Sequence, residues 1–377
     1  MRLLKSNLSQ IGELSLLKKL CCKLPLRKDV VIGAGDDCAV VRIAGDKNYD
    51  YLLKSDGVVE GVHFKSNTKP ELIGHKALGR VLSDIAAMGG EPLWALINLV
   101  APSKTPVKRI EKVYAGMNVL AKRFNLSIVG GDVSSGHELQ LHVFGVGRVK
   151  KGKSMLRSGA KAGDAIFVTG ALGGSIAGKH LSFMPRLCEG QWLLRKNFAT
   201  AMIDISDGLL RDLGHIISAD GVGARLMLDR IPMSAAARRC SCVIGRLTVV
   251  RPLRPPTTLR VAMRAGGRVF PQADPSRRSA TATSSADHLY VRRKSVLGHA
   301  LADGEDYELL FTVPERKIKS FVKAWQRNFK LACTQIGWIT ARKGDLEGID
   351  SGGKVIELNE AGFEHFRKRE AQSGKGT

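Results

Sequence analysis

MIDISDGLLRDLGHI, residues 202–216, decides the fold class of this chain. It reads as an apolar strand, a turn that contains Asp207 and Gly208, and an amphipathic helix. Residues 165–181, AIFVTGALGGSIAGKHL, have the same order of strand, glycine-rich turn and helix. Further strand-like runs follow at 223–231, 306–313 and 331–339. We therefore predict an α/β unit in this part of the chain.

The first 150 residues show a similar alternation of elements. Helical periodicity covers residues 71–90 and 108–124. Strand candidates stand at 51–59, 93–100, 126–131 and 139–149. A basic turn at 150–164 separates the two parts. The prediction is an α/β fold, in an α+β arrangement of two domains, with residues 1–150 in one and 151–377 in the other.

The bulk composition is that of a globular protein, with 44% hydrophobic and 25% charged residues. No apolar run reaches the length of a membrane span, and residues 1–26 lack the features of a signal peptide. That segment predicts an amphipathic helix instead. The seven cysteines show no paired C-x-x-C spacing, so neither a zinc site nor a disulfide scaffold is indicated. The expected compartment is the reducing cytoplasm.

The net charge of +24 suggests a nucleic-acid partner, but its distribution weakens that interpretation. Residues 235–296 contain twelve Arg and one Lys against two Asp, which gives this segment +11. Its Arg, Pro, Ser and Ala texture differs from the rest of the chain. Three interpretations stay open: a disordered surface insertion, a stretch translated from a shifted frame, and a basic arm that binds nucleic acid. Aromatic residues are nearly absent, which disfavours the last of these.

Acidic residues stand beside glycine-rich turns at four places in the chain. These are Gly35-Asp36-Asp37, Ser55-Asp56-Gly57, Gly131-Asp132 and Ser206-Asp207-Gly208. Mg²⁺ prefers oxygen ligands and is usually held by a few carboxylates together with substrate phosphates. Any one Asp-Gly pair is ordinary turn chemistry, but four such pairs beside strand-like runs favour a magnesium–phosphate site.

Other candidates have competing structural interpretations. Asp84 lies in a helical pattern after Lys76 and Arg80, which also fits a solvated salt-bridge face. His63 fits a structural histidine equally well. Arg157 lies in a basic turn and either grips a phosphate or is simply solvated.

The familiar nucleotide motifs are missing from the sequence. There is no G-x-x-x-x-G-K-[ST] loop, since His180 follows the lysine in GALGGSIAGKH, and no H-R-D or D-F-G set. A bound nucleotide would therefore be held by acids and metal ions.

Taken in order, the motifs resemble those of thiamine-monophosphate kinases, in the superfamily that includes aminoimidazole ribonucleotide synthetase. The resemblance covers nearly the whole chain except 235–296. It includes IGAGDDCAVV, KSDGVVEGVHF, GHKALGRVLSDIAAMGGEPLWAL, IVGGDVSSG, MIDISDGLLRDLGHI and ADGEDYELLFTVPE. It implies an N-terminal domain whose mixed sheet pairs with its twin in a homodimer, followed by a C-terminal α/β domain.

The resemblance also implies residue roles. The metal ligands would be Asp37, Ser55, Asp56, Asp84, Asp132, Asp204 and Asp207. Gly131, Asp132, Arg157 and Ser206 would contact ATP, and His63, Glu305 and Phe363 would face thiamine monophosphate. Asp84, Asp132 and Arg157 would be the catalytic set. Asp212 is expected to be a surface or helix-start acid.

The activity so implied is transfer of the ATP γ-phosphoryl group to thiamine monophosphate, with ATP as co-substrate and several Mg²⁺ ions. Neither a membrane nor a nucleic acid is an expected partner. The chain departs from the family pattern at Lys54, where Ser or Thr is frequent, at Asp303, which replaces a glycine, and in the insertion. The alternatives are another ATP-using enzyme of the superfamily, a kinase damaged by the insertion, and an inactive homologue whose insertion binds nucleic acid.

Overall fold

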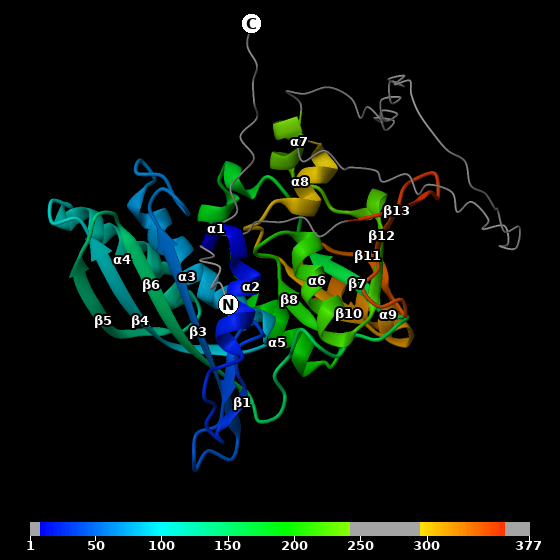
Figure 1. The fold of residues 1–377 in the computed structure, drawn as a ribbon, viewed down its shortest axis with the longest axis horizontal. Helices are drawn as coiled ribbons and strands as arrows, with labels where there is room; N and C mark the ends of the chain where they lie inside the picture. The colour runs from blue at the N-terminus through cyan, green and yellow to red at the C-terminus, as the bar shows by residue number, and fades with distance from the viewer. Residues whose placement is uncertain (1–7, 242–294, 359–377) are drawn as a thin grey trace, which may run out of the picture.

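Two β-sheets form the framework of the molecule (Figure 1). The computed structural model describes residues 8–241 and 295–358. The first sheet contains β1 (Val30–Ile32), β2 (Ala39–Val41), β3 (Tyr49–Val59), β4 (Glu91–Ala101), β5 (Ser127–Ser135) and β6 (Gln140–Lys150). Its strand order is β1-β2-β3-β6-β4-β5, and only β4 and β5 pair in parallel. The predicted mixed sheet is thus confirmed.

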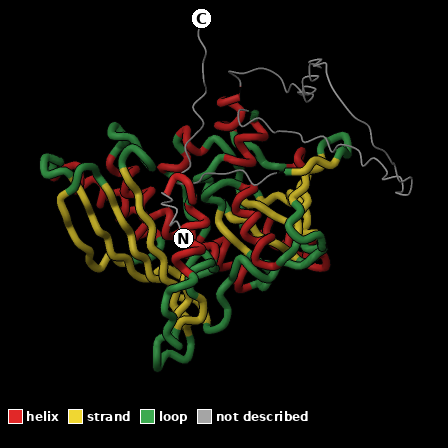
Figure 2. Tube along the Cα trace, in the orientation of Figure 1, coloured by secondary structure: helices red, strands yellow, loops and turns green. Residues whose placement is uncertain are grey.

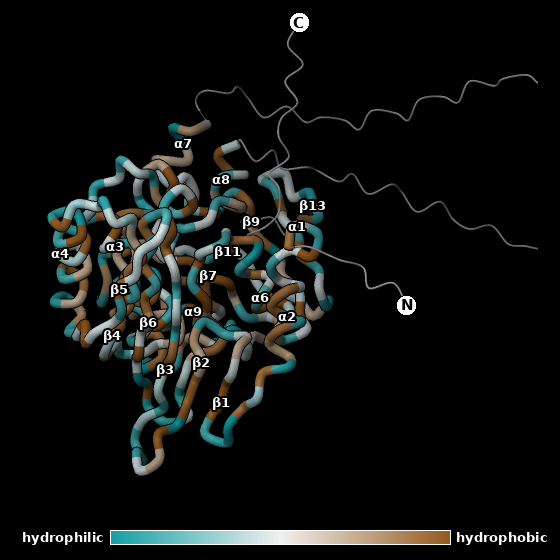
Figure 3. The backbone as a smooth tube through the Cα atoms, turned by 60° about the vertical axis from the view of Figure 1, so that its left-hand side comes forward, coloured by the Kyte–Doolittle hydropathy of each residue, from teal (hydrophilic) through white to brown (hydrophobic). Residues whose placement is uncertain are grey.

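β3 and β6 form the backbone of this sheet, because they pair antiparallel from Tyr49–Lys150 to Val59–Gln140. The end of the sheet that carries β1 and β2 projects from the body of the molecule in two views (Figures 1 and 3). The loop between β1 and β2 carries Asp36 and Asp37.

One face of the first sheet is covered by α3 (Pro70–Ala87) and α4 (Val107–Arg123). Gly74 and Gly116 allow these helices to pack closely, since a Cβ at Gly74 would lie 1.8 Å from the Val113 carbonyl oxygen. The other face is open at β4 and β5. Its apolar side chains Trp94, Leu96 and Val129 are exposed.

The second sheet has the order β13-β12-β9-β11-β7-β10-β8. Its strands are β7 (Ala165–Thr169), β8 (Met202–Asp204), β9 (Gly223–Met227), β10 (Leu309–Val313), β11 (Cys333–Thr340), β12 (Leu346–Ile349) and β13 (Val355–Glu357). All its pairs are antiparallel except β9 with β12. The helices of this unit are α5 (Leu187–Arg195), α6 (Leu209–Asp220), α7 (Ala235–Ser241), α8 (Val296–Ala302) and α9 (Ile318–Asn328).

Helix α3 connects the two units, because it packs on the first sheet and also contacts α5 and β8. Figure 2 shows the strands of the two sheets well separated, with helices between them. Side chains on one surface of α3 therefore face the second unit.

Most predicted elements are confirmed, but the helix expected within 165–181 is wrong. After β7 the chain forms only the 3₁₀ turns η1 (Ser175–Ala177) and η2 (Lys179–Leu181). Gly173, Gly174 and Gly178 have φ values of +83°, +70° and +141°, which no α-helix accommodates. Short 3₁₀ turns also occur at η3 (Leu228–Arg230) and η4 (Glu315–Lys317).

The segment of unusual composition begins inside a packed helix. Within α7, Ala237 is fully buried, and α7 contacts α8. Both ends of the segment therefore belong to the folded unit, while 242–294 lie outside the described residues.

The N-terminal helix predicted from residues 1–26 is present in two pieces, α1 (Leu8–Ile11) and α2 (Glu13–Cys21). Gly12, at φ +75°, separates them. In the part of the chain that the structure describes, no helix combines the length and apolarity needed to cross a membrane.

Candidate active site

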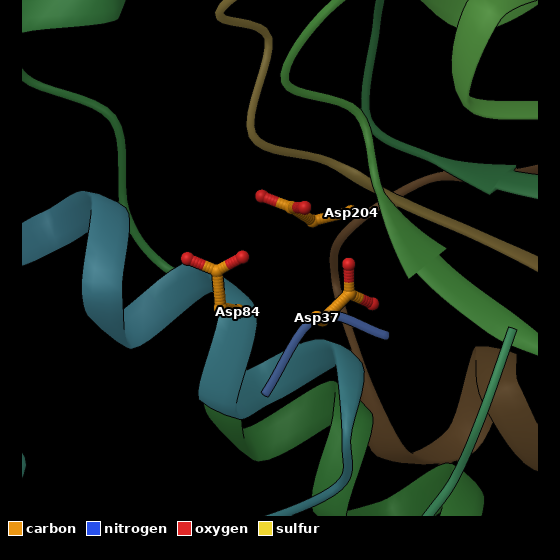
Figure 4. Close-up of side chains that lie close together, drawn as sticks. All are labelled: Asp37, Asp84 and Asp204. Atoms are coloured by element: carbon orange, nitrogen blue, oxygen red, sulfur yellow. The ribbon is translucent and has the colours of Figure 1, made fainter. Parts of the chain in front are cut away.

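Three buried aspartates from separate elements converge between the two units (Figure 4). Asp37 comes from the β1–β2 loop, Asp84 from α3, and Asp204 from the end of β8. Each offers a carboxylate oxygen, and these oxygens lie within 4.8 Å of one another. Three like charges at this separation need compensating cations.

Arg157 supplies one of these cations. Its Nη2 and Nε donate to Asp37 Oδ1 at 2.6 and 3.1 Å, and its backbone N–H donates to Asp36. The Asp36-Asp37 pair thus binds Arg157 from two directions. The interpretation of Arg157 as a merely solvated residue is wrong.

Lys54, on β3, supplies another cation, with its Nζ 2.9 Å from Asp84 Oδ1. Burial opposes the charge of Lys54, but the carboxylates of Asp84 and Asp56 raise its pKa above the ordinary value. Asp56 is itself paired with Arg80 at 3.2 Å. The predicted acid cluster therefore lies within a set of internal cations.

The charged residues Lys76, Arg80 and Asp84, which are spaced by four along α3, do not form a solvated salt-bridge face, so that alternative is wrong. Lys76 is fully buried and Asp84 is 6% exposed. Arg80 pairs with Asp56 of β3, and Asp84 pairs with Lys54. These side chains therefore point into the protein and not along the helix surface.

The triad carries strongly perturbed carboxyl groups. Burial raises the pKa of Asp84 to about 7, with Lys54 opposing the rise and Asp56 and Asp37 adding to it. Burial and the charge of Asp84 raise the pKa of Asp204, whose Oδ2 accepts a hydrogen bond from Ser83 Oγ at 2.6 Å. Such carboxylates are typical of a site that receives a further cation.

One atom of the triad lacks a partner. Asp37 Oδ2 is buried without any hydrogen-bond donor among the described residues. A buried carboxylate oxygen of this kind is costly unless a ligand satisfies it. The oxygen donor set and this orphaned atom together fit a hard divalent cation such as Mg²⁺.

The turn before α6 is organised by Asp212. Its Oδ2 accepts the backbone N–H groups of Ser206, Asp207 and Gly208 at 3.0–3.1 Å. Asp212 is 2% exposed, so it is a helix-start acid and the surface alternative is wrong. Asp207 lies on the other side of this turn, with Arg211 Nε 3.4 Å from its Oδ2.

A second ionic group surrounds Glu305. Lys76 Nζ lies 2.5 Å from Glu305 Oε1, 2.7 Å from the His63 carbonyl oxygen and 2.8 Å from His180 Nδ1. His180 Nδ1 is also 3.0 Å from Glu305 Oε2. Glu305 has φ +64°, a left-handed conformation that is unusual for glutamate and typical of functional sites. Lys76 thus links the His63 backbone carbonyl to Glu305, whereas the His63 ring accepts a hydrogen bond from Val59 N–H at 3.1 Å. Phe363 lies outside the described residues.

Three sequence-predicted residues lie away from the triad. Gly131 and Asp132 are exposed on β5, the edge strand, and a Cβ at Gly131 would lie 1.8 Å from the Ile97 carbonyl oxygen. Ser55 is also exposed, and it points to the opposite side of β3 from its neighbours Lys54 and Asp56.

The backbone N–H groups of Gly173 and Gly174 in the glycine-rich loop at 170–174 already have acceptors and are not free for a phosphate. Gly173 N–H donates to Asp306 and Gly174 N–H donates to Asp303, both at 2.8 Å. Asp303, which departs from the family pattern, therefore has a structural role in holding this loop.

The comparisons with known proteins agree with this geometry. Residues 35–149 match the family model described as AIR synthase related protein, N-terminal domain. Thiamine-monophosphate kinase of Buchnera aphidicola subsp. Acyrthosiphon pisum is 31% identical over 363 residues, covering 90% of this chain and 94% of that protein. The chain belongs to the thiamine-monophosphate kinase family.

Other members of the family support this assignment. Thiamine-monophosphate kinase of Escherichia coli K12 is 30% identical, over 94% of this chain and 98% of that protein. A solved structure of AaThiL complexed with AMPPCP and TMP superposes with a TM-score of 0.72 at 26% identity, covering 96% of this chain and 99% of that one. These matches cover 94% and 96% of this chain, so the likeness extends well beyond the residues that the family model matches.

Sequence reasoning missed several residues of the kinase-family site: Ser83, Lys76, Arg80 and His180. The first three lie on α3 with Asp84, and 76, 80 and 84 are spaced by four residues. This polar i, i+4 column, on a helix otherwise buried on both sides, was the available signal.

Proposed function

We propose that this chain transfers the γ-phosphoryl group of ATP to the phosphate of thiamine monophosphate, giving thiamine diphosphate and ADP. The observation that carries the proposal is the buried Asp37, Asp84 and Asp204 triad with the orphaned Asp37 Oδ2. It lies on a chain that follows thiamine-monophosphate kinases over more than 90% of its length. Two anionic substrates must meet, so the main task of the site is charge neutralisation and alignment.

The residues present fit Mg²⁺, which would be held first by the three triad aspartates. Four further ligands are proposed from the family pattern: Ser55, Asp56, Asp132 and Asp207. Bound Mg²⁺ would neutralise phosphate charge and polarise the transferring phosphoryl group. Asp84, Asp132 and Arg157 are the proposed catalytic residues.

Arg157 is placed to act on phosphate as well as on Asp37. Its side chain is 21% exposed and its guanidinium offers a planar set of donors, so it suits bidentate contact with the phosphates of ATP. Gly131, Asp132 and Ser206 are the other proposed ATP contacts. The turn at Ser206 is already rigid, because Asp212 holds its backbone N–H.

The acceptor is proposed to bind at His63, Glu305 and Phe363. Glu305 carries a carboxylate suited to the cationic thiazolium ring of the substrate. Its backbone N–H donates to the Ser206 carbonyl at 2.7 Å, which connects the proposed acceptor and ATP sites. The acceptor phosphate is ionised at neutral pH, so the transfer needs no general base.

We also propose a cytoplasmic homodimer that pairs through the open face of the first sheet. The exposed side chains of Trp94, Leu96 and Val129 on this face support the proposal, since exposed apolar patches often mark interfaces. The two sheets correspond to the proposed domains 1–150 and 151–377. We propose neither a membrane nor a nucleic acid as a partner.

The test is thiamine diphosphate formation by the purified chain with ATP, thiamine monophosphate and Mg²⁺. Asp84→Asn is expected to abolish product, whereas Asp229→Asn, at an exposed position in η3, is expected to keep full activity. A folded wild-type chain that forms no product would overturn the proposal, as would an Asp84→Asn variant with wild-type activity.

A further inference from the structure

Lys54 and Arg157 are the two cations that pair directly with a triad aspartate among the described residues. The Nζ of Lys54 is 2.9 Å from Asp84 Oδ1, and its side chain is only 23% exposed. On β3 its neighbour Asp56 is paired with Arg80, so Asp56 does not compete for the ammonium group at hydrogen-bond distance. Lys54 therefore forms its ion pair with Asp84.

The charge balance of the triad shows what this lysine does. Asp37, Asp84 and Asp204 together carry three negative charges when ionised. Arg157 compensates Asp37, and Lys54 compensates Asp84. Asp204 has the neutral hydroxyl of Ser83 as its hydrogen-bond partner. One uncompensated negative charge remains, together with the unpartnered oxygen of Asp37.

We propose that Lys54 is a built-in substitute for a divalent cation at Asp84, and that it lowers the number of ions this site binds or their affinity. The inference rests on the proposed function, since it assumes that the triad is a metal site. A lysine ammonium is a compact point charge that can neutralise a carboxylate but cannot bridge several oxygens. A divalent ion approaching Asp84 would have to displace the ammonium group or share the carboxylate with it.

The proposal assigns Lys54 a specific electrostatic role that a packing residue would not have. Removal of one positive charge within a few ångströms of a partly buried cation site strengthens cation binding, because the screening there is weak. Lys54→Met keeps most of the side-chain volume and removes the charge. Lys54→Ser also removes the charge and restores the residue type that is frequent in the family.

The experiment is a titration of the purified full-length chain with Mn²⁺ alone, followed by electron paramagnetic resonance of free Mn²⁺, without substrates. Both Lys54 variants are expected to bind one more Mn²⁺ per chain, or to bind it at least about tenfold more tightly than wild type. Lys104→Ser, at an exposed loop position, is the matched control and is expected to match wild type.

Thermal unfolding supplies a second readout that is independent of activity. Without metal, both variants are expected to melt below wild type, because Asp84 loses its partner, and saturating Mn²⁺ is expected to raise their melting temperatures more than that of wild type. Unchanged Mn²⁺ stoichiometry and affinity in folded variants would overturn the role of Lys54. If wild type binds no Mn²⁺ and forms no thiamine diphosphate, the proposed function fails; if wild type does both and the variants bind Mn²⁺ as it does, only this inference fails.

Discussion

Substitution of Lys76 by Met tests how much the buried ion pair between Lys76 and Glu305 contributes to folding stability. Lys76 has no exposed surface, and its ammonium group contacts Glu305, His180 and the His63 carbonyl. Burial lowers the pKa of Lys76 from 10.5 to about 8, although Glu305 opposes the change. The cost of keeping this lysine charged is therefore about 3 kcal/mol.

Glu305 shows the opposite shift. Burial alone would raise its pKa, but His180 and Lys76 lower it from 4.5 to about 2, which corresponds to about 3 kcal/mol in favour of the ionised form. Because the attraction between Lys76 and Glu305 enters both shifts, it counts only once, and a buried ion pair of this kind contributes little net stability. Lys76→Met leaves the Glu305 carboxylate with His180 and solvent, and we expect a loss of about 2–3 kcal/mol. The double variant Lys76→Met, Glu305→Gln should recover to within about 1 kcal/mol of wild type.

The assay is urea unfolding of wild type, Lys76→Met, Glu305→Gln and the double variant at pH 7. The KM for thiamine monophosphate is measured in parallel. The unfolded chain binds one more proton than the folded chain between pH 8 and 10.5, so Lys76 should make wild-type stability rise with pH across that window. This contribution should be missing from Lys76→Met. A single variant as stable as wild type, with no coupling to Glu305→Gln, would refute the reasoning. We expect KM to rise in Glu305→Gln and in the double variant, since both lose the Glu305 carboxylate even where stability returns.

Three further predictions concern packing, pH and the insertion. Gly74→Ala brings a Cβ within 1.8 Å of the Val113 carbonyl oxygen, so chemical denaturation should show a loss of about 3 kcal/mol or more, against less than about 0.5 for Gly352→Ala in an exposed turn; equal losses would contradict the close packing of α3 and α4. Burial and two nearby arginines lower the pKa of His215 to about 4. The unfolded chain therefore binds one more proton than the folded chain between pH 4 and 6.5. Acidification from pH 6.5 to 4 should cost at most about 3 kcal/mol of folding stability, and His215→Gln should remove this pH dependence. An unchanged pH dependence in that variant would show that it comes from other groups. Replacement of 242–294 by a short Gly-Ser linker should leave the melting temperature and kinase activity unchanged, because α7 and α8 already contact each other; a large loss of either would show that the segment supports the fold.

The long periodic segments of the fold could be predicted from sequence because local pattern determines them. Residues 71–90 and 139–149 repeat their apolar positions over many residues, and the structure has α3 and β6 there. The helix predicted within 165–181 is absent because Gly173, Gly174 and Gly178 adopt positive φ. Asp306 and Asp303 hold this loop by accepting the backbone N–H groups of Gly173 and Gly174. That restraint comes from residues about 130 positions away, and no local pattern contains it.

Of the triad acids, the Asp-Gly turns indicated only Asp37, whereas Asp84 stood in a helical pattern and Asp204 was named through the family resemblance. Arg157 and Lys54 were noted as candidates, but their pairing with Asp37 and Asp84 was not predicted. Arg157 and Asp37 are 120 residues apart, and Lys76 and Glu305 are further apart still, so only the folded chain brings each pair together. What the sequence did contain was the column 76, 80, 84 on α3. A helix that packs against a sheet on one side and a second unit on the other has no solvated face on which such residues can lie. Its charged side chains must therefore find partners inside the protein: Arg80 and Asp84 pair with β3 of the same unit, and Lys76 pairs with Glu305 of the second unit. The contact of α3 with the second unit is thus polar at Ser83–Asp204 and Lys76–Glu305, beside the proposed chemistry, and apolar at Ala87, which packs with Trp192 and Leu193.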